Sequence, residues 1–235
     1  MTIAIENPSR EFHCSTKINP DLAYLCGVFA GDGSISIRND KHEYSLKCVG
    51  NPKDEKEFYE LIITSLFKKV FNVKISAKYF DSGTTFGFRI FSKELIIYLT
   101  KFIGLPVGKK YANICIPHLF YENRCYLISF IRGVFDTDGC ISFKKRYRTY
   151  PYYPVISLSS KSKGFVKQIA DVLKQENFRV VESYEYRVKD WRNKNGFTTI
   201  SRIELNGKYN LDLWLQKIGF HSPKHQNKIK ELKKK

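Results

Sequence analysis

Hydrophobic residues recur along the first half of the chain at two different periods. A spacing of three to four positions, which predicts helices with one buried face, covers residues 20–31, 54–71 and 93–103. An alternation of apolar and polar positions, which predicts half-buried strands, covers residues 34–38, 44–49, 74–80 and 85–91. The predicted order is therefore helix, two strands, helix, two strands and helix.

The second half repeats this order. Its predicted helices lie near residues 123–136, 161–176 and 208–218. Its predicted strands lie near residues 140–148, 154–159, 179–188 and 197–205. Two strand pairs per half predict an α+β fold with two antiparallel sheets, one in each half.

The two halves also share short stretches of sequence in the same order. LCGVFAGDGSI at residues 25–35 matches IRGVFDTDGCI at residues 131–141, and VGKKYANI aligns with SPKHQNKI near the end of each half. Such an internal repeat indicates two similar subdomains. We place them at residues 1–120 and 121–235, packed against each other because no Gly/Ser-rich linker separates them.

Small residues recur at a spacing of four on the first helix of each half. Gly27 and Gly31 lie on one helix, and Gly133 and Thr137 hold the equivalent positions on the other. Small residues at this spacing allow two helices to approach closely. Apolar residues surround them, so we expect the two helices to pack together as the interface between the halves.

Asp32 and Asp138 follow these helices directly. A helix carries partial negative charge at this end, so an anion there costs about 0.3–1 kcal/mol. Two carboxylates at adjacent helix ends also repel each other. Mg²⁺ would turn this unfavourable cluster into a site, because it binds carboxylates, phosphate oxygens and water. The backbone carbonyls of Gly31 and Thr137, which are free at the helix ends, are further candidate metal ligands.

Residues 20–230 resemble the two-motif LAGLIDADG homing endonucleases, since LCGVFAGDG and IRGVFDTDG both resemble the family motif. Ala30 replaces the first acidic residue of that motif in the first copy, while Asp136 keeps it in the second. The resemblance implies two pseudo-symmetric αββαββα subdomains that pack through the motif helices. It further implies a monomer whose two sheets form a saddle over the major groove of double-stranded DNA.

The resemblance also implies an activity. Such a protein makes a metal-dependent double-strand break at a long, near-palindromic target, as in intron homing. Two or three Mg²⁺ ions would bind at Asp32 and Asp138, and Ca²⁺ or Mn²⁺ could replace them. Asn51 and Ser160 correspond to residues that position water near the metals. Lys109 and Lys224 correspond to basic residues near the scissile phosphates, with Lys110 as a near alternative to Lys109.

Polar and basic residues alternate with apolar ones on the predicted strands. Ile35, Ile37, Ile141 and Phe143 should face the core, which leaves the opposite face free for base edges in the major groove. The candidate DNA-binding residues on the strands are Ser34, Ser36, Arg38, Lys47, Arg89, Ser142, Lys144, Arg146, Arg148, Arg187 and Arg202. The lysine-rich tail from Lys224 onward is expected to be a nonspecific phosphate contact or disordered.

Charge supports a polyanionic partner. The 235 residues contain 40 Lys and Arg against 23 Asp and Glu, for a formal net charge of +17. Residues 1–120 hold 16 basic and 12 acidic residues, whereas residues 121–235 hold 24 and 11, so the second half should make more phosphate contacts. Nucleic acid is favoured over membrane, because no basic amphipathic anchor is evident.

The sequence is also compatible with other classes of protein to different degrees. An RNA-binding maturase of the same fold could act on intron RNA, although retention of both aspartates favours a nuclease. A transcription regulator would need an added DNA-binding module, for which the chain leaves no room. An intein would need a nucleophile at residue 1 and a terminal Asn. The sequence runs from Met1 to ELKKK, so we expect a free-standing enzyme or a trimmed form of a longer protein.

Features of location point to the cell interior. The sequence contains neither an apolar run long enough to span a membrane nor the pattern of a secretory signal. Its six cysteines form no CxxC pair and no zinc-ligand spacing, which is typical of reduced thiols. We therefore expect a protein of the cytoplasm or an organellar matrix, and not a secreted one.

Overall fold

The computed structural model describes residues 11–146 and 150–233 of the chain. The helices of the first half are α1 (Pro20–Asp32), α2 (Pro52–Glu57), α3 (Thr64–Phe71) and α4 (Lys93–Ile97). Its strands are β1 (Gly33–Arg38), β2 (Glu43–Gly50), β3 (Lys78–Phe80) and β4 (Thr85–Phe91). A π-helical segment, Phe58–Ile63, joins α2 to α3, and another, Tyr98–Ile103, extends α4.

The second half repeats this order with α6 in the place of α2 and α3, and it ends in a further helix, α8. Its helices are α5 (Arg124–Thr137), α6 (Lys163–Gln175), α7 (Gly207–Lys217) and α8 (Pro223–Lys233). Its strands are β5 (Gly139–Arg146), β6 (Tyr150–Ser160), β7 (Val180–Lys189) and β8 (Phe197–Asn206). No helix in the described part of the chain is long and apolar enough to cross a membrane.

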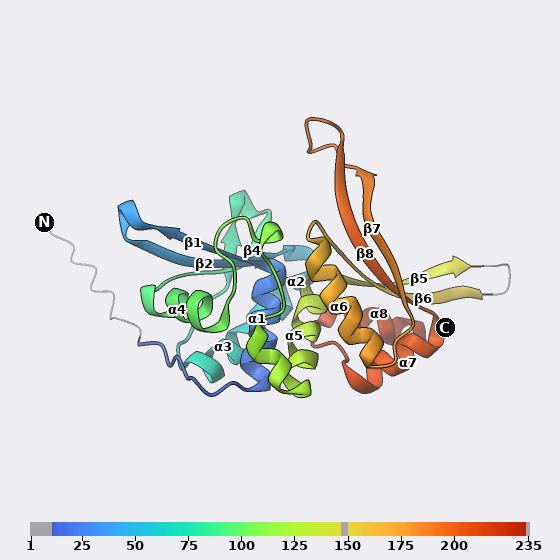
Figure 1. The fold of residues 1–235 in the computed structure, drawn as a ribbon, viewed down its shortest axis with the longest axis horizontal. Coiled ribbons are helices and arrows are strands. Elements are labelled where there is room, and N and C mark those ends of the chain that lie inside the picture. Colours follow the sequence, from blue (N-terminus) through green and yellow to red (C-terminus); the bar gives the residue numbers. More distant parts are fainter. Residues whose placement is uncertain (1–10, 147–149, 234–235) are drawn as a thin grey trace, which may run out of the picture.

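Each half contains one four-stranded sheet in which all neighbouring strands are antiparallel. The strand orders, β1-β2-β4-β3 and β5-β6-β8-β7, are the same once the repeat is taken into account. Helices α1 and α5 lie side by side at the centre, with one sheet on either side of them (Figure 1). The predicted α+β fold with two antiparallel sheets is thus confirmed.

Local sequence explains where the two central helices begin. The side chain of Asn19 accepts a hydrogen bond from the backbone N–H of Leu22 at 2.9 Å, and Pro20 occupies the first helical position. Asn123 caps α5 in the same way by accepting from the N–H of Cys125 at 2.8 Å. Both helices are then buried over most of their length, as their apolar residues require.

The sheets bury the faces that the alternation predicts. Ile35 and Ile141 are fully or almost fully buried, and Ile37 and Phe143 pack against the same core. The third predicted strand of the first half is shorter than expected, because only Lys78–Phe80 pairs with β4. Elsewhere the predicted helices and strands differ from the observed ones mainly at their ends.

The C-terminal tail differs from the prediction. Residues 223–233 form helix α8, which overturns the alternative of a disordered tail, while the nonspecific phosphate contact stays a prediction. The carboxylate of Asp136 accepts from the N–H groups of His221 and Ser222, just before α8, at 3.0 and 3.1 Å. Two residues of this helix, His225 and Ile229, are buried. Their spacing of four is helical, but the many lysines around them conceal it.

Gly27 and Gly133 form the closest contact between α1 and α5. A Cβ atom built on Gly27 would lie 2.1 Å from the backbone oxygen of Phe130. A Cβ atom on Gly133 would lie 2.3 Å from the backbone oxygen of Tyr24 and 3.0 Å from the Cα atom of Gly27. The two helices therefore touch through their backbones, as the spacing of small residues predicted.

This contact predicts that Gly133→Ala destabilises the protein. The new methyl group has no space, so the helices must separate, at a cost of about 1–3 kcal/mol in the free energy of unfolding. The matched control is Gly164→Ala on α6, because a Cβ atom there meets nothing within 4 Å. Chemical denaturation should show a loss for Gly133→Ala and no loss for Gly164→Ala. Equal stability of the two variants would contradict the backbone contact.

Candidate functional site

Asp32 and Asp138 lie at the same end of the two central helices. Asp32 is the last residue of α1, and Asp138 directly follows α5. A Cβ atom built on Gly31 would lie 3.6 Å from the carboxyl carbon of Asp138. The second carboxyl group thus lies against the backbone next to the first. The structure therefore brings together two predicted carboxylates that are far apart in the sequence.

Tyr59 fixes one oxygen of Asp32. Its hydroxyl group donates a hydrogen bond to Oδ2 of Asp32 at 2.8 Å, and its ring is fully buried. The pKa of Asp32 is raised to about 8, first by burial and then by the negative charges of Glu55 and Asp138. The Tyr59 hydrogen bond and the Lys224 charge oppose this rise. Three carboxyl groups therefore compete for positive charge at this site.

Asp138 differs from Asp32 in its exposure. Its side chain touches solvent, but the surrounding protein still desolvates the carboxyl group enough to raise its pKa. The charges of Lys110 and Lys224 act in the opposite direction, whereas Glu55 adds to the rise. Each half therefore contributes charged groups that act on the aspartate of the other.

Glu55 is a buried acidic residue that the sequence analysis did not identify. It lies in the first turn of α2, where its Oε2 accepts from the N–H of Asn51 and its Oε1 from Nζ of Lys224, each at 2.5 Å. A Cβ atom built on Gly50 would lie 2.0 Å from Oε2, so the glycine provides the space for this carboxylate. In the sequence, Glu55 resembles any charged residue on a solvated helix, and only Gly50 hints at its position.

The structure brings Lys224 and Lys110 to the site, and not Lys109. Nζ of Lys224 donates to the backbone oxygen of Thr137 at 2.9 Å, and Nζ of Lys110 donates to that of Gly33 at 3.2 Å. Lys109 is exposed. The repeat aligns Lys109 with Lys224, but Lys224 lies on helix α8 whereas residues 110–112 form a single 3₁₀ turn. This difference in local structure shifts the equivalent lysine by one residue.

Asn51 and Ser160 make local backbone contacts. The side chain of Asn51 caps α2 by accepting from the N–H of Lys53 at 3.0 Å. Oγ of Ser160 accepts from the N–H of Ser162 at 3.2 Å. Asn51 directly follows β2, as predicted, whereas Ser160 is the last residue of β6. Their role in positioning water stays a prediction.

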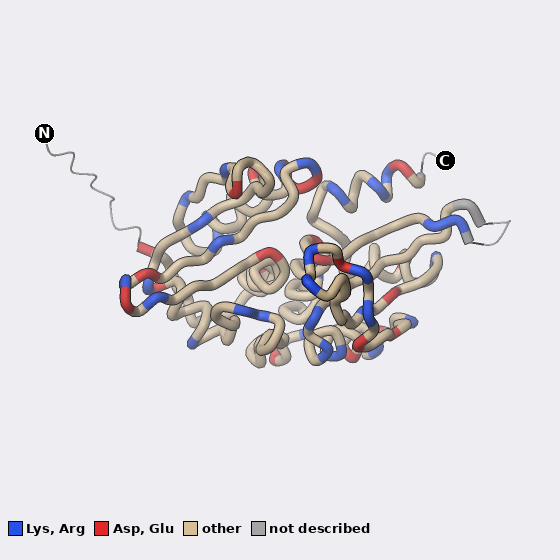
Figure 2. Tube along the Cα trace, turned by 90° about the horizontal axis from the view of Figure 1, so that it is seen from above, with Lys and Arg blue, Asp and Glu red and all other residues tan. Residues whose placement is uncertain are grey.

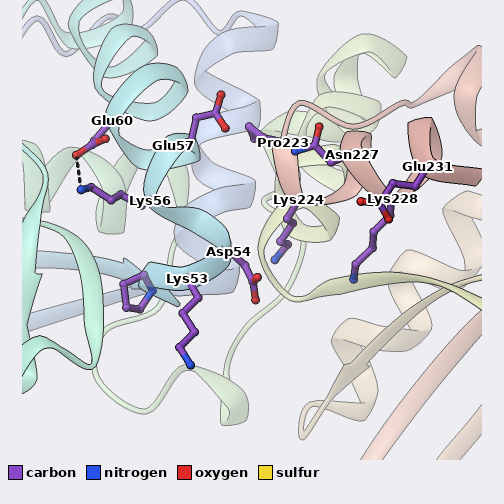
Figure 3. Close-up of a pocket in the computed structure, with 11 residues that line it drawn as sticks. Lys53, Asp54, Lys56, Glu57, Glu60, Pro223, Lys224, Asn227, Lys228 and Glu231 are labelled. Atoms are coloured by element: carbon purple, nitrogen blue, oxygen red, sulfur yellow. Dashed lines mark ion pairs between the residues drawn. The ribbon is translucent and has the colours of Figure 1, made fainter.

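A cleft lies beside Lys224, between α2 and α8 (Figure 3). It has a volume of about 690 Å³. Its charged lining residues are Lys53, Asp54, Lys56, Glu57, Glu60, Lys224, Lys228 and Glu231. Lys224 points from α8 toward α2, where it meets Glu55. The ion pair between Lys224 and Glu55 therefore joins the two halves at the edge of the aspartate site.

The open face of the first sheet carries several of the candidate DNA-binding residues. Strand register places Lys47 between Ser34 and Arg89 in one row, and Ser36 opposite Ser45. Arg38, at the end of β1, is exposed. Lys47 pairs with Asp81 at 2.7 Å and Arg89 with Glu43 at 3.1 Å. Lys and Arg follow the strands of this sheet in Figure 2. The face thus offers both polar and cationic groups.

The second sheet has a less regular arrangement. Arg202 and Lys144 both pair with Glu204, at 3.1 and 3.6 Å, and Ser142 lies opposite Val155. Arg187 lies opposite Thr199, whereas Arg202 lies opposite Ser159 and Ser183. Arg187 and Arg202 therefore point to opposite faces, because Thr199 and Arg202 are an odd number of positions apart on β8.

One further candidate, Arg146, is the last residue of β5. Arg146 pairs with Tyr150 after an irregularity in the register, and Arg148 lies outside the described residues. Within the described ranges, no group of three or more His, Cys, Asp or Glu side chains forms a potential metal site. The candidate metal ligands are therefore the two aspartates and the backbone carbonyls of Gly31 and Thr137, and the latter already accepts from Lys224.

Comparison with known proteins finds a similar domain and similar folds. The model of the LAGLIDADG-like domain matches residues 126–219. The structure of I-DmoI in complex with DNA and Ca has the same fold, with a TM-score of 0.59 and 16% identity over 90% of this chain and 97% of that one. The I-LtrWI LAGLIDADG homing endonuclease bound to target DNA gives a TM-score of 0.55 and 12% identity, over 88% and 87%. Residues 126–219 thus match a LAGLIDADG-like domain, and the chain as a whole has the fold of these two endonucleases.

Curated relatives of this chain contain the similar segment within longer chains. The glutamine–fructose-6-phosphate aminotransferase of Methanocaldococcus jannaschii is 26% identical over 213 residues, which is 91% of this chain. The DNA polymerase of Thermococcus hydrothermalis is 23% identical over 229 residues, or 95% of this chain. The chain spans only 17% and 13% of the lengths of these two relatives.

The buried ion pair predicts a large effect of Glu55→Gln on stability. The side chains of Glu55 and Lys224 are only 7% and 16% exposed, so loss of the carboxylate leaves a desolvated ammonium group without its partner. The free energy of unfolding should fall by about 3 kcal/mol. The matched control is Lys69→Gln, which breaks an exposed ion pair with Asp21 and should cost less than about 1 kcal/mol.

A second substitution tests the cause of this loss. Adding Lys224→Met to Glu55→Gln removes the unpaired charge and should recover part of the lost stability, as measured by denaturation with urea. A double variant that is as unstable as the sum of the two single variants would show that the two residues do not interact.

Proposed function

We propose that this protein is a site-specific DNA endonuclease that uses divalent metal ions to make a double-strand break. The observation that carries the proposal is the meeting of Asp32 and Asp138 at the ends of two packed, repeated helices. One carboxylate from each half is the arrangement that a pair of cuts, one in each strand, requires. We place the division between the two halves near residue 120.

The residues at the site fit a hard divalent cation. Two carboxylates and backbone carbonyl oxygens are ligands typical of Mg²⁺ and Ca²⁺, and phosphate oxygens and water would complete the set. Asp32 and Asp138 would hold the ions, two or three in number, with the carbonyls of Gly31 and Thr137 as further candidates. Bound Mg²⁺ supplies a Lewis acid and lowers the pKa of a water molecule that attacks phosphorus.

The remaining side chains orient groups and place charge. Tyr59 holds Oδ2 of Asp32 by a hydrogen bond at 2.8 Å and so fixes the direction of the carboxylate. Lys110 and Lys224 place positive charge near the two aspartates, where negative charge would develop on the phosphate oxygens. Asn51 and Ser160, at the ends of their strands, are candidates for holding water on either side.

The two sheets provide the surface for recognition of a long duplex. Antiparallel strands fit the major groove, where each base pair presents a distinct pattern of donors and acceptors. The excess of basic residues in residues 121–235 supports stronger phosphate contacts from the second half. Because the two open faces carry different residues, the target should be only approximately palindromic.

The curated relatives support a mobile genetic element. Their names describe unrelated proteins: an aminotransferase, a DNA polymerase and a replication factor. A segment that recurs in such different chains does not serve their individual activities. A DNA break at a chosen site would explain this distribution, because repair of the break can copy the encoding DNA into the cut gene.

Incubation with a library of random duplexes tests the proposal. With Mg²⁺, cleaved products should share one long site, and without Mg²⁺ the same site should stay intact. Binding of intron RNA with no cleavage of any duplex would instead support a maturase.

Asp32→Asn and Asp138→Asn should each lower double-strand cleavage of the selected site by roughly 100-fold or more. Each variant loses the charge of one metal ligand, while DNA binding in Ca²⁺ should persist. The matched control is Asp171→Asn, which changes an exposed acid on α6 and should leave cleavage unchanged. Full cleavage by Asp32→Asn would remove that residue from the site.

Arg89→Ala and Arg202→Ala should relax base preference on opposite sides of the cut. Arg89 lies on the open face of the first sheet and Arg202 on that of the second. An Arg that contacts a guanine edge contributes about 1–3 kcal/mol of discrimination. Each variant is the control for the other in a cleavage profile over all single-base changes. If cleavage of every target sequence fell equally, the arginine would be a phosphate contact instead.

A further inference from the structure

The second half carries a long strand pair that has no equal in the first half. Strands β7 and β8 have ten residues each, whereas β3 has three and β4 has seven. At about 3.3 Å per residue, ten paired residues span roughly 33 Å. Figure 1 shows this hairpin extending well beyond the rest of the molecule. Its tip therefore lies at the far end of a hairpin whose base, Val180 paired with Leu205, packs against the core.

Hydrogen bonds define the turn at the tip, residues 190–196. The N–H of Asp190 donates to the oxygen of Gly196 at 2.8 Å, and the N–H of Gly196 donates to that of Asn193 at 2.8 Å. The side-chain amide of Asn193 donates to the oxygen of Phe197 at 2.6 Å. Within this turn, the Trp191 side chain is 91% exposed. The turn thus holds a large aromatic ring in solvent.

The charges around Trp191 favour a polyanionic partner. Among residues 186–198 there are four basic residues, Arg187, Lys189, Arg192 and Lys194, and one acidic residue, Asp190. Trp191 and the partly exposed Phe197 lie among these residues. Aromatic rings among cations are typical of nucleic-acid surfaces, where the cations contact phosphates and a ring packs on sugars or bases. A lipid surface would call for a broader apolar face.

We propose that Trp191 is a DNA contact at the outer end of the half-site bound by residues 121–235. The ring packs against the bases in a groove, and Arg192 and Lys194, in the same turn, bind the flanking phosphates. This inference rests on the proposed function, because it needs a duplex on the open faces of the sheets. It implies that the DNA footprint extends further from the cut on this side than on the other.

Tryptophan fluorescence reads this contact directly. The chain has two tryptophans, and Trp214 is fully buried, so quenching by added acrylamide reports Trp191. The probe is a mixed-sequence duplex of about 40 base pairs at low salt, where nonspecific binding is strong. We expect saturating duplex to quench the Trp191 emission and to protect it from acrylamide. Trp191→Phe should show neither change.

Affinity provides a second measurement. Trp191→Ala should weaken binding of this duplex roughly tenfold, the order found for loss of one aromatic–base contact. The matched control is Leu61→Ala, which removes an apolar side chain of 60% exposure from the Phe58–Ile63 segment and should not change affinity. Both variants remove exposed side chains, and their melting temperatures should equal that of the natural sequence.

The outcomes separate this inference from the function on which it rests. Duplex binding in fluorescence anisotropy, with unchanged Trp191 emission and acrylamide quenching, would overturn the contact and leave the endonuclease proposal standing. Absence of any duplex binding would overturn both. Protection of Trp191 by phosphatidylglycerol vesicles, but not by duplex, would show a membrane contact in place of the DNA contact.

Discussion

The contact of Gly27 with Gly133 is the constraint on which the rest of the structure depends. Because the helices touch through their backbones, their ends lie close enough for Asp32 and Asp138 to meet. The same contact sets the two sheets on either side of one axis. A bulkier residue at either glycine would alter both the spacing of the carboxylates and the angle between the sheets.

Both halves contribute charged groups to the electrostatic repulsion at the two aspartates. Asp32, Asp138 and the buried Glu55 place three carboxyl groups near one another, and Lys110 and Lys224 offset them only in part. A buried cluster of this kind stabilises no fold by itself. Binding of cations would offset the repulsion in this cluster. A site that binds cations would therefore also be a site of low local stability when they are absent.

The repeat, the fold class and the two aspartates could be predicted from the sequence because each depends on local spacing. Apolar periodicity marks α1 and β1, and the glycines mark the helix contact. The burial of Glu55 could not be predicted, because α8 of the second half packs against α2 of the first half and brings Lys224 to Glu55. The sequence could not distinguish Lys110 from Lys109. A sequence alignment does not show that the residues near Lys110 form a 3₁₀ turn whereas those near Lys224 form a helix.

The ion pair of Glu55 with Lys224 shows how far the duplicated halves have diverged. The repeat places Gly164 where the first half has Glu55, so the second half has no carboxylate of its own to offer. Two copies of residues 121–235 would bring two Lys224 ammonium groups together without a Glu55. A homodimer of residues 121–235 alone would therefore lack this ion pair. Each half depends on the other for a buried charge partner.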